Sequence, residues 1–316
     1  MGMAIGILSG KGGVGKTTVV ANLGAVLTNV FNKNVVILDS NIATSHLGLH
    51  LGLYEDLPVT LREVIKRKTP LSYAIYIHPT TGIRVIPAPL SGDDINLSRK
   101  KLGEIIDKLK KDYELVLVDC APGLGREVVT AVTNIDAGII VTTPDFPAVA
   151  DALKSVELLK LFKKSILGIV INRYSNKKYE LTIQEIASVT GVDVIATIPY
   201  DDRVLESVAK GVPVTLLFSG SRASQSLTQL GASVIGEEYK PPGLLSAVKE
   251  MFGIFRVPTT PNLQRKAFLQ IKQKEYDLGI QEKSDVEELK SQLTAQVKGE
   301  LKREILERVK ERMKEK

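Results

Sequence analysis

Short apolar segments alternate with longer segments of helical periodicity from residue 4 to about residue 236. Strands this apolar are buried on both faces of a sheet, and the helical segments between them provide the cover. The pattern therefore predicts an α/β fold, a mostly parallel twisted sheet with helices on both faces. The predicted strands are Ala4–Leu8, Val35–Leu38, Gly82–Pro87, Leu115–Asp119, Ala137–Thr142, Leu167–Asn172 and Val194–Ile198.

The character of the chain changes after residue 240. Pro241-Pro242-Gly243 interrupts regular structure, and Pro258-Thr259-Thr260-Pro261 forms a second break. Beyond it the chain is rich in Lys, Glu and Gln, and Ser284 with Glu287 has the spacing of a helix capping box. We therefore predict a globular domain (1–240), a linker with a short amphipathic helix (241–261) and a charged α-helical extension (262–316).

Charge is distributed unevenly between these parts. Residues 1–240 hold 26 Lys and Arg against 24 Asp and Glu, whereas residues 241–316 hold 16 against 12. Because non-specific DNA binding needs a clustered basic face, the near-neutral globular domain disfavours DNA as a partner. The basic tail fits plain solubility, an anionic membrane surface or an acidic partner protein.

Residue counts exclude several kinds of site. The single cysteine, Cys120, rules out an intrachain disulfide and the several cysteine ligands that iron–sulfur carriers and nitrogenase-type reductases need. Three histidines, His46, His50 and His78, argue against a His-rich metal site. The sequence shows no signal-peptide pattern and no apolar run of membrane-spanning length, so we expect a cytoplasmic protein.

The clearest chemical signal follows the first predicted strand. Gly10 to Thr17 fits the phosphate-binding P-loop pattern, and the apolar run after it suits a helix. Glycines let the backbone approach an anion, and the helix N-terminus adds its positive end. The predicted ATP-binding residues are Gly10, Lys11, Gly12, Gly13, Val14, Gly15, Lys16, Thr17 and Thr18.

Two of these residues and one further acid have specific expected roles around Mg²⁺ and the phosphates. Lys16 can bridge the outer phosphates, and the hydroxyl of Thr17 can ligate Mg²⁺. Val116-Leu117-Val118-Asp119 is an apolar strand that ends in a carboxylate, as in a Walker B motif. This strand would hold Asp119 near the ion that Thr17 binds.

The lysine at position 11 adds a further feature. Lys11-Gly-Gly-Val-Gly-Lys16-Thr17-Thr18 resembles the deviant Walker A motif of the MinD/ParA family of ATPases, and the resemblance spans roughly residues 3–240, most like MinD proteins. The resemblance implies that Lys11 crosses a homodimer interface to the partner's ATP and acts in catalysis with Lys16. The alternative is a solvated lysine on a loop tip.

The resemblance extends to the loop after the second predicted strand. Asp39 matches the family acid near the water shell of Mg²⁺, but the second family acid, credited with placing the attacking water, is here Asn41. An amide can orient water and cannot take its proton, so we expect slow hydrolysis. His46 also stands where MinD proteins commonly carry Asn.

Two later positions resemble the family's base pocket. Asn172 matches the residue that reads the adenine edge, and Pro199 lies in the loop that closes this pocket. An amide offers both a donor and an acceptor for this purpose. The alternative for Asn172 is a turn-forming residue at a strand end.

The segment 243–257 looks like the membrane-docking helix of MinD proteins. Its apolar stripe contains Leu244, Val248, Met251, Phe252 and Phe255. It departs from the MinD helix in carrying few basic residues and in being followed by about sixty residues. Packing against the globular domain is the alternative. A single helix of this kind binds weakly, so pairing two in a dimer would matter.

Together these features predict an ATP-dependent dimerisation switch of MinD type. It would position a cellular assembly, hydrolyse ATP slowly, and associate peripherally with the membrane in the ATP state. The first alternative is a ParA-like, DNA-associated positioning ATPase. The second is an ATP-gated scaffold with little hydrolysis, whose tail does the work.

Overall fold

A computed structural model describes residues 2–42, 45–53, 57–66, 69–89 and 98–239 of the chain. The predicted linker helix and the charged extension lie outside these residues. Their roles, and the predicted division of the chain into three parts, therefore stay predictions.

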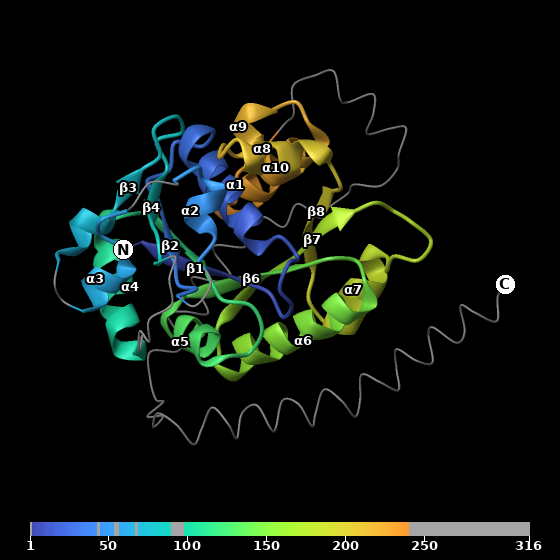
Figure 1. Cartoon of the computed structure of the whole chain (residues 1–316). Coiled ribbons are helices and arrows are strands. Elements are labelled where there is room, and N and C mark those ends of the chain that lie inside the picture. The colour runs from blue at the N-terminus through green and yellow to red at the C-terminus, as the bar shows by residue number, and fades with distance from the viewer. Residues whose placement is uncertain (1, 43–44, 54–56, 67–68, 90–97, 240–316) are drawn as a thin grey trace.

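The described residues form a sheet of eight strands in the order β3-β4-β2-β5-β1-β6-β7-β8 (Figure 1). All neighbouring strands are parallel except β3, which runs antiparallel to β4 at one edge. The strands are β1 (Met3–Leu8), β2 (Val35–Asp39), β3 (Tyr76–Ile77), β4 (Arg84–Ile86), β5 (Leu115–Asp119), β6 (Ala137–Thr142), β7 (Ser165–Tyr174) and β8 (Val194–Pro199).

This architecture confirms the predicted fold class and the seven predicted strands. The two-residue edge strand β3 was not predicted. With two residues it is shorter than the roughly four to eight over which a strand pattern can be recognised, and Ile77 is largely exposed.

Helices cover both faces of the sheet (Figure 1). They are α1 (Lys16–Asn29), α2 (Leu47–His50), α3 (Leu61–Ile65), a 3-10 turn η1 (Leu71–Ala74), α4 (Arg99–Asp112), α5 (Arg126–Asn134), α6 (Phe146–Leu161), α7 (Ile183–Thr190), α8 (Asp202–Ala209), α9 (Val214–Leu217) and α10 (Arg222–Ile235). No helix in these described ranges is long and apolar enough to cross a membrane.

Two hydrophobic clusters lie on opposite faces of the sheet. Alternate residues of β1 point to different clusters: Ile5 and Ile7 join α1 and α10, whereas Ala4 and Leu8 join α4, α5 and α6. Such two-sided burial is what fully apolar parallel strands require. The polar loops at the carboxyl ends of β1, β2 and β5 are thereby fixed side by side, at the edge where open α/β sheets bind ligands.

Candidate nucleotide-binding site

The P-loop connects β1 to α1 in a conformation that depends on two glycines. Gly15 has a φ of 93°, and a Cβ there would lie 2.1 Å from Nδ2 of Asn172. A Cβ on Gly10 would lie 1.9 Å from the carbonyl oxygen of Asp151 on α6. Any larger residue at either position would therefore shift the loop, whose amides would face a bound phosphate at the start of α1.

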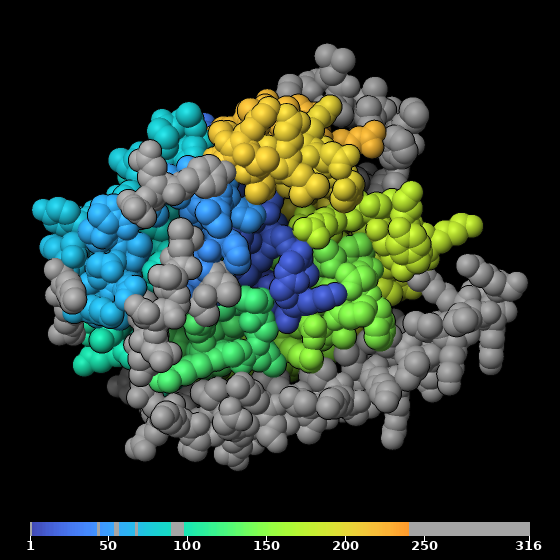
Figure 2. Space-filling view, viewed as in Figure 1, coloured from blue at the N-terminus to red at the C-terminus, as the bar shows by residue number. Residues whose placement is uncertain are grey.

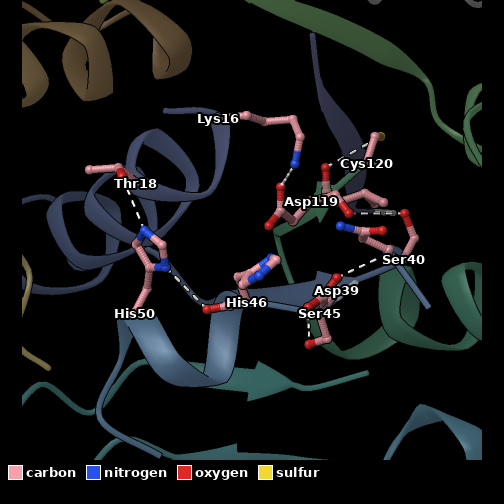
Figure 3. Close-up of polar contacts among 11 residues, drawn as sticks. Lys16, Thr18, Asp39, Ser40, Ser45, His46, His50, Asp119 and Cys120 are labelled. Carbon is pink, nitrogen blue, oxygen red and sulfur yellow. Dashed lines mark hydrogen bonds and ion pairs between the residues drawn. The ribbon is translucent and has the colours of Figure 1, made fainter. Parts of the chain in front are cut away.

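Lys16 is buried at the base of the loop and donates a hydrogen bond from Nζ to Oδ1 of Asp119 (Figure 3). Its side chain is 7% exposed and that of Asp119 is 2% exposed. The bond joins the first residue of α1 to the last residue of β5. The structure thus brings together the predicted phosphate-binding lysine and the predicted metal-site acid.

Asp39 lies beside Asp119 because β2 and β5 pair in parallel with these two residues in register. Asp39 is fully buried, and burial together with the neighbouring charge of Asp119 raises its pKa to about 7. Asp39 accepts hydrogen bonds from the amide of Asn41 (2.9 Å) and from Oγ of Ser45 (2.7 Å), which oppose that rise. Two adjacent buried carboxylates leave an unfavourable charge that a cation would relieve.

This donor set fits Mg²⁺, a hard cation that prefers oxygen ligands and keeps several waters. The hydroxyl of Thr17, at the start of α1, and the carboxylates of Asp39 and Asp119 would hold it. No cluster of three or more His, Cys, Asp or Glu suited to a metal occurs among the residues that the structure describes. Mg²⁺ is commonly held by one or two carboxylates together with the phosphates of a bound nucleotide, which matches the two carboxylates beside the P-loop.

The loops that follow β2 and β5 are tied to each other and to the P-loop. The amide and the hydroxyl of Ser40 both donate to the carbonyl oxygen of Asp119, each at 3.0 Å. The amide of Gly123 donates to the carbonyl oxygen of Ser9 at 2.9 Å. Asn41 is buried next to this junction. A shift in one loop would therefore displace the others through these hydrogen bonds.

Lys11 occupies a different environment from Lys16. Lys11, Gly12 and Gly13 are exposed at the loop tip, and the dark blue segment reaches the surface in the middle of the face shown in Figure 2. The Nζ of Lys11 lies 3.6 Å from Oδ1 of Asp145, and the two side chains are 48% and 47% exposed. Lys11 therefore takes no part in the buried contacts around Asp119.

Asn172 lies two residues before the end of β7, and Pro199 is the last residue of the neighbouring strand β8. Asn172 is buried and donates from Nδ2 to the carbonyl oxygen of Val14 at 2.8 Å. Pro199 is half-buried. Asn172 thus holds the P-loop through the backbone of Val14, a role that the sequence did not reveal. Its contact with the adenine base stays a prediction.

Sequence reasoning also missed three polar residues that the structure places at the site. Ser45 bonds Asp39, Asp145 pairs with Lys11, and His50 contacts Thr18 (3.3 Å). One of them had a local signal: Asp145 precedes Phe-Pro and caps α6, accepting the amide of Ala148. The other two depend on how the chain folds back onto the P-loop.

Comparison with known proteins identifies the family. The family model described as ParA, NUBPL iron-transfer P-loop NTPase, matches residues 1–235. The chain belongs to the ParA family of P-loop NTPases. The single cysteine of the chain, Cys120, is buried, and burial raises its pKa to about 12. The resemblance found in the sequence is thus confirmed for this ParA-family chain.

Its relatives include several MinD proteins. An uncharacterised ATP-binding protein of Methanocaldococcus jannaschii is 37% identical over 80% of this chain and 94% of its own length. The septum site-determining protein MinD of Bacillus subtilis is 28% identical over 80% of this chain and 99% of its own. The structure of MinD with Mg-ADP from Pyrococcus horikoshii matches with a TM-score of 0.70 at 31% identity, covering 74% of this chain and 96% of that one.

Proposed function

We propose that this protein is an ATP-driven dimerisation switch of MinD type, which hydrolyses ATP slowly to reverse the dimer. Lys16 and Thr17 hold the phosphates and Mg²⁺ within one protomer, together with Asp39 and Asp119. Lys11 reaches the phosphates of the second protomer. Bound Mg²⁺ would neutralise charge on the phosphates and on the carboxylate pair.

The observation that carries this proposal is the contrast between the two P-loop lysines. Lys16 is 7% exposed and engaged with Asp119, whereas Lys11 is 48% exposed and lies 3.6 Å from Asp145. A half-exposed ion pair at this distance contributes about 0–1 kcal/mol, so Lys11 can leave it at little cost. A cation placed outside its own protomer's buried site is available to a partner's phosphates.

Slow turnover is proposed on the chemistry of Asn41. Asn41 lies two residues after Asp39, and its backbone N–H donates to the carboxylate of Asp39 at 2.9 Å. Its side-chain amide can orient an attacking water, but it cannot accept the proton of that water. Hydrolysis would then depend on positioning and on the charges of the two lysines.

The relatives support a role in spatial organisation. Several are septum site-determining MinD proteins, and one solved neighbour, 25% identical, is a MinC:MinD cell division complex from Aquifex aeolicus with a TM-score of 0.68. We infer that this chain likewise positions a cellular assembly. We also propose that the segment 243–257 supplies membrane or partner affinity in the ATP state.

Two lysine variants test the proposal. Lys16→Ala should abolish ATP binding, because it removes the buried cation at the base of the loop. Lys11→Ala should bind ATP as wild type does but stay monomeric, as measured by equilibrium binding and by light scattering in Mg-ATP. Lys154→Ala is the matched control, since this lysine on α6 pairs with Asp151 of its own helix, at 2.7 Å.

A Lys11→Ala variant that dimerises in ATP as wild type does would contradict the proposal.

Sedimentation with anionic liposomes, with and without ATP, then tests the proposed membrane association. Full-length protein should pellet in ATP, and a chain ending at Lys240 should stay in solution.

A further inference from the structure

The one-turn helix α2 presents two kinds of side chain at helical spacing. Leu47 and Leu51 are fully buried in the cluster that also contains residues of α1. His46 and His50 share the same four-residue spacing; His46 is exposed and His50 is half-buried. The two leucines fix the helix in the core, which gives His50 a defined place beside the P-loop.

His50 uses both ring nitrogens: Nε2 reaches α1, and Nδ1 contacts the residue that precedes α2. Its Nε2 lies 3.3 Å from Oγ1 of Thr18, and its Nδ1 lies 3.1 Å from the carbonyl oxygen of His46 (Figure 3). At the other end of the segment, Ser45 bonds the carboxylate of Asp39. A continuous polar path therefore runs from the predicted metal-site acid to the P-loop helix.

The chemistry of these groups fixes the direction of each hydrogen bond. A carbonyl oxygen can only accept, so Nδ1 of His50 carries a hydrogen and donates it to His46. In the neutral ring Nε2 then has no hydrogen and accepts from the hydroxyl of Thr18. Burial lowers the pKa of His50, which favours this neutral form.

Thr18 is the third residue of α1, immediately after Thr17. Its hydroxyl lies in the first turn of the helix, where the amide groups of a helix N-terminus would face a bound phosphate. The hydroxyl has one hydrogen, so Thr18 can donate it to His50 or to a phosphate oxygen but not to both. When it turns toward a phosphate, Nε2 of His50 loses its donor.

We propose that His50 is a positioning residue for the nucleotide and acts through the hydroxyl of Thr18. When Thr18 donates its hydrogen to a phosphate oxygen, the ring of His50 takes up one proton from solvent and donates from Nε2 to Oγ1 of Thr18. Nδ1 keeps its bond to His46 throughout. Nucleotide binding is thereby coupled to the uptake of a proton by His50 and to the position of α2 against α1. This inference rests on the proposed function, because it requires a phosphate in the P-loop.

Several charged groups surround the ring and set the sign of the effect. Within the protein, Asp119 of β5 favours the charged ring, whereas Lys16 of α1 and His46 of α2 oppose it. A nucleotide would add negative charge to this balance and favour the imidazolium. The helix α8, which also packs against α2, carries the charged residues Asp202, Arg203 and Glu206.

The test is the pH dependence of ADP affinity, measured by calorimetry on the full chain in EDTA from pH 5.5 to 8.5. The variants are His50→Gln, which can still donate and accept but cannot take up a proton, and His50→Leu, which can do neither. His46→Gln is the control, because His46 contributes its backbone carbonyl to the path. Titration of ADP itself is common to all proteins and cancels in the comparison.

The ratio of the ADP affinity of wild type to that of His50→Gln should rise as the pH falls. The rise should reach up to about tenfold per pH unit, the limit for uptake of one proton on binding. Calorimetry in buffers of different ionisation enthalpy should show uptake of a proton by wild type and by His46→Gln, but not by His50→Gln. The His50→Leu variant should bind more weakly than His50→Gln at every pH.

Two results would distinguish a failure of the proposed role of His50 from a failure of the proposed function. Parallel pH profiles for wild type and His50→Gln, with equal proton uptake, would overturn the role of His50 and leave the nucleotide site intact. A wild type that binds no ADP at any pH would overturn the proposed function itself. Should His50→Leu fail to fold, the comparison with His50→Gln decides alone.

Discussion

Replacing Asp39 with asparagine should stabilise the protein while weakening Mg²⁺-dependent nucleotide binding. The carboxylate is fully buried beside Asp119 and accepts hydrogen bonds from the backbone amide of Asn41 and the hydroxyl of Ser45. An asparagine oxygen can accept from the Asn41 amide, and its NH₂ group can donate to the Ser45 hydroxyl after that hydroxyl turns. The substitution thus removes a buried charge and keeps the hydrogen bonds.

The size of the effect follows from the pKa of Asp39, which is about 7 in the folded protein against an ordinary value of 3.8. Because the folded pKa is raised, the folded state binds more protons than the unfolded state between these values. The free energy of unfolding therefore falls as the pH rises from about 4 to 7, by up to about 4 kcal/mol at about 1.4 kcal/mol per pKa unit. Between pH 5 and pH 8 the expected loss is about 3 kcal/mol.

Urea denaturation in EDTA at pH 5, 6, 7 and 8 measures this difference. The stabilisation of Asp39→Asn over wild type should grow with pH and level off near pH 8. Asp112→Asn, at the exposed end of α4, controls for the change in net charge. If Asp39→Asn gave the same increment at pH 5 and pH 8, the carboxylate would not be the strained, buried charge that the structure indicates.

The other expected effects concern the loop, the turnover and the tail. Gly15→Ala should lower stability by at least about 1–2 kcal/mol from its positive φ and impair ADP binding through its clash with Asn172, whereas Gly12→Ala, with open space around it, should leave the unfolding midpoint unchanged. Asn41→Asp should raise phosphate release in Mg-ATP, and equal or lower turnover would show that water is positioned by other groups. Phe252→Glu with Phe255→Glu should abolish ATP-dependent liposome sedimentation and spare dimerisation; unchanged pelleting would move the binding surface to residues 284–316.

The sequence predicted the elements that position the site better than the contacts within it. The apolar runs ending at Leu8, Leu38 and Asp119 predicted three strands, and the structure shows that they are neighbours in the sheet. The register that places Asp39 beside Asp119 depends on strand pairing between residues eighty positions apart, which no local pattern records.

The polar contacts of the site are of the same long-range kind. Asn172 reaches Val14 across 158 positions of sequence, and His50 reaches Thr18 across 32. Asn172 was predicted from a family resemblance to face the base, and the structure adds its hydrogen bond to the P-loop. His50 was seen in the sequence only as one of three histidines unsuited to a metal site.

The mass of the protein in solution tests the central claim most directly. Light scattering after size exclusion should give a mass near 34.4 kDa in Mg-ADP and near twice that value in saturating Mg-ATP. A wild type that binds ATP and remains at the mass of one chain would contradict the account of Lys11 and of the dimerisation switch.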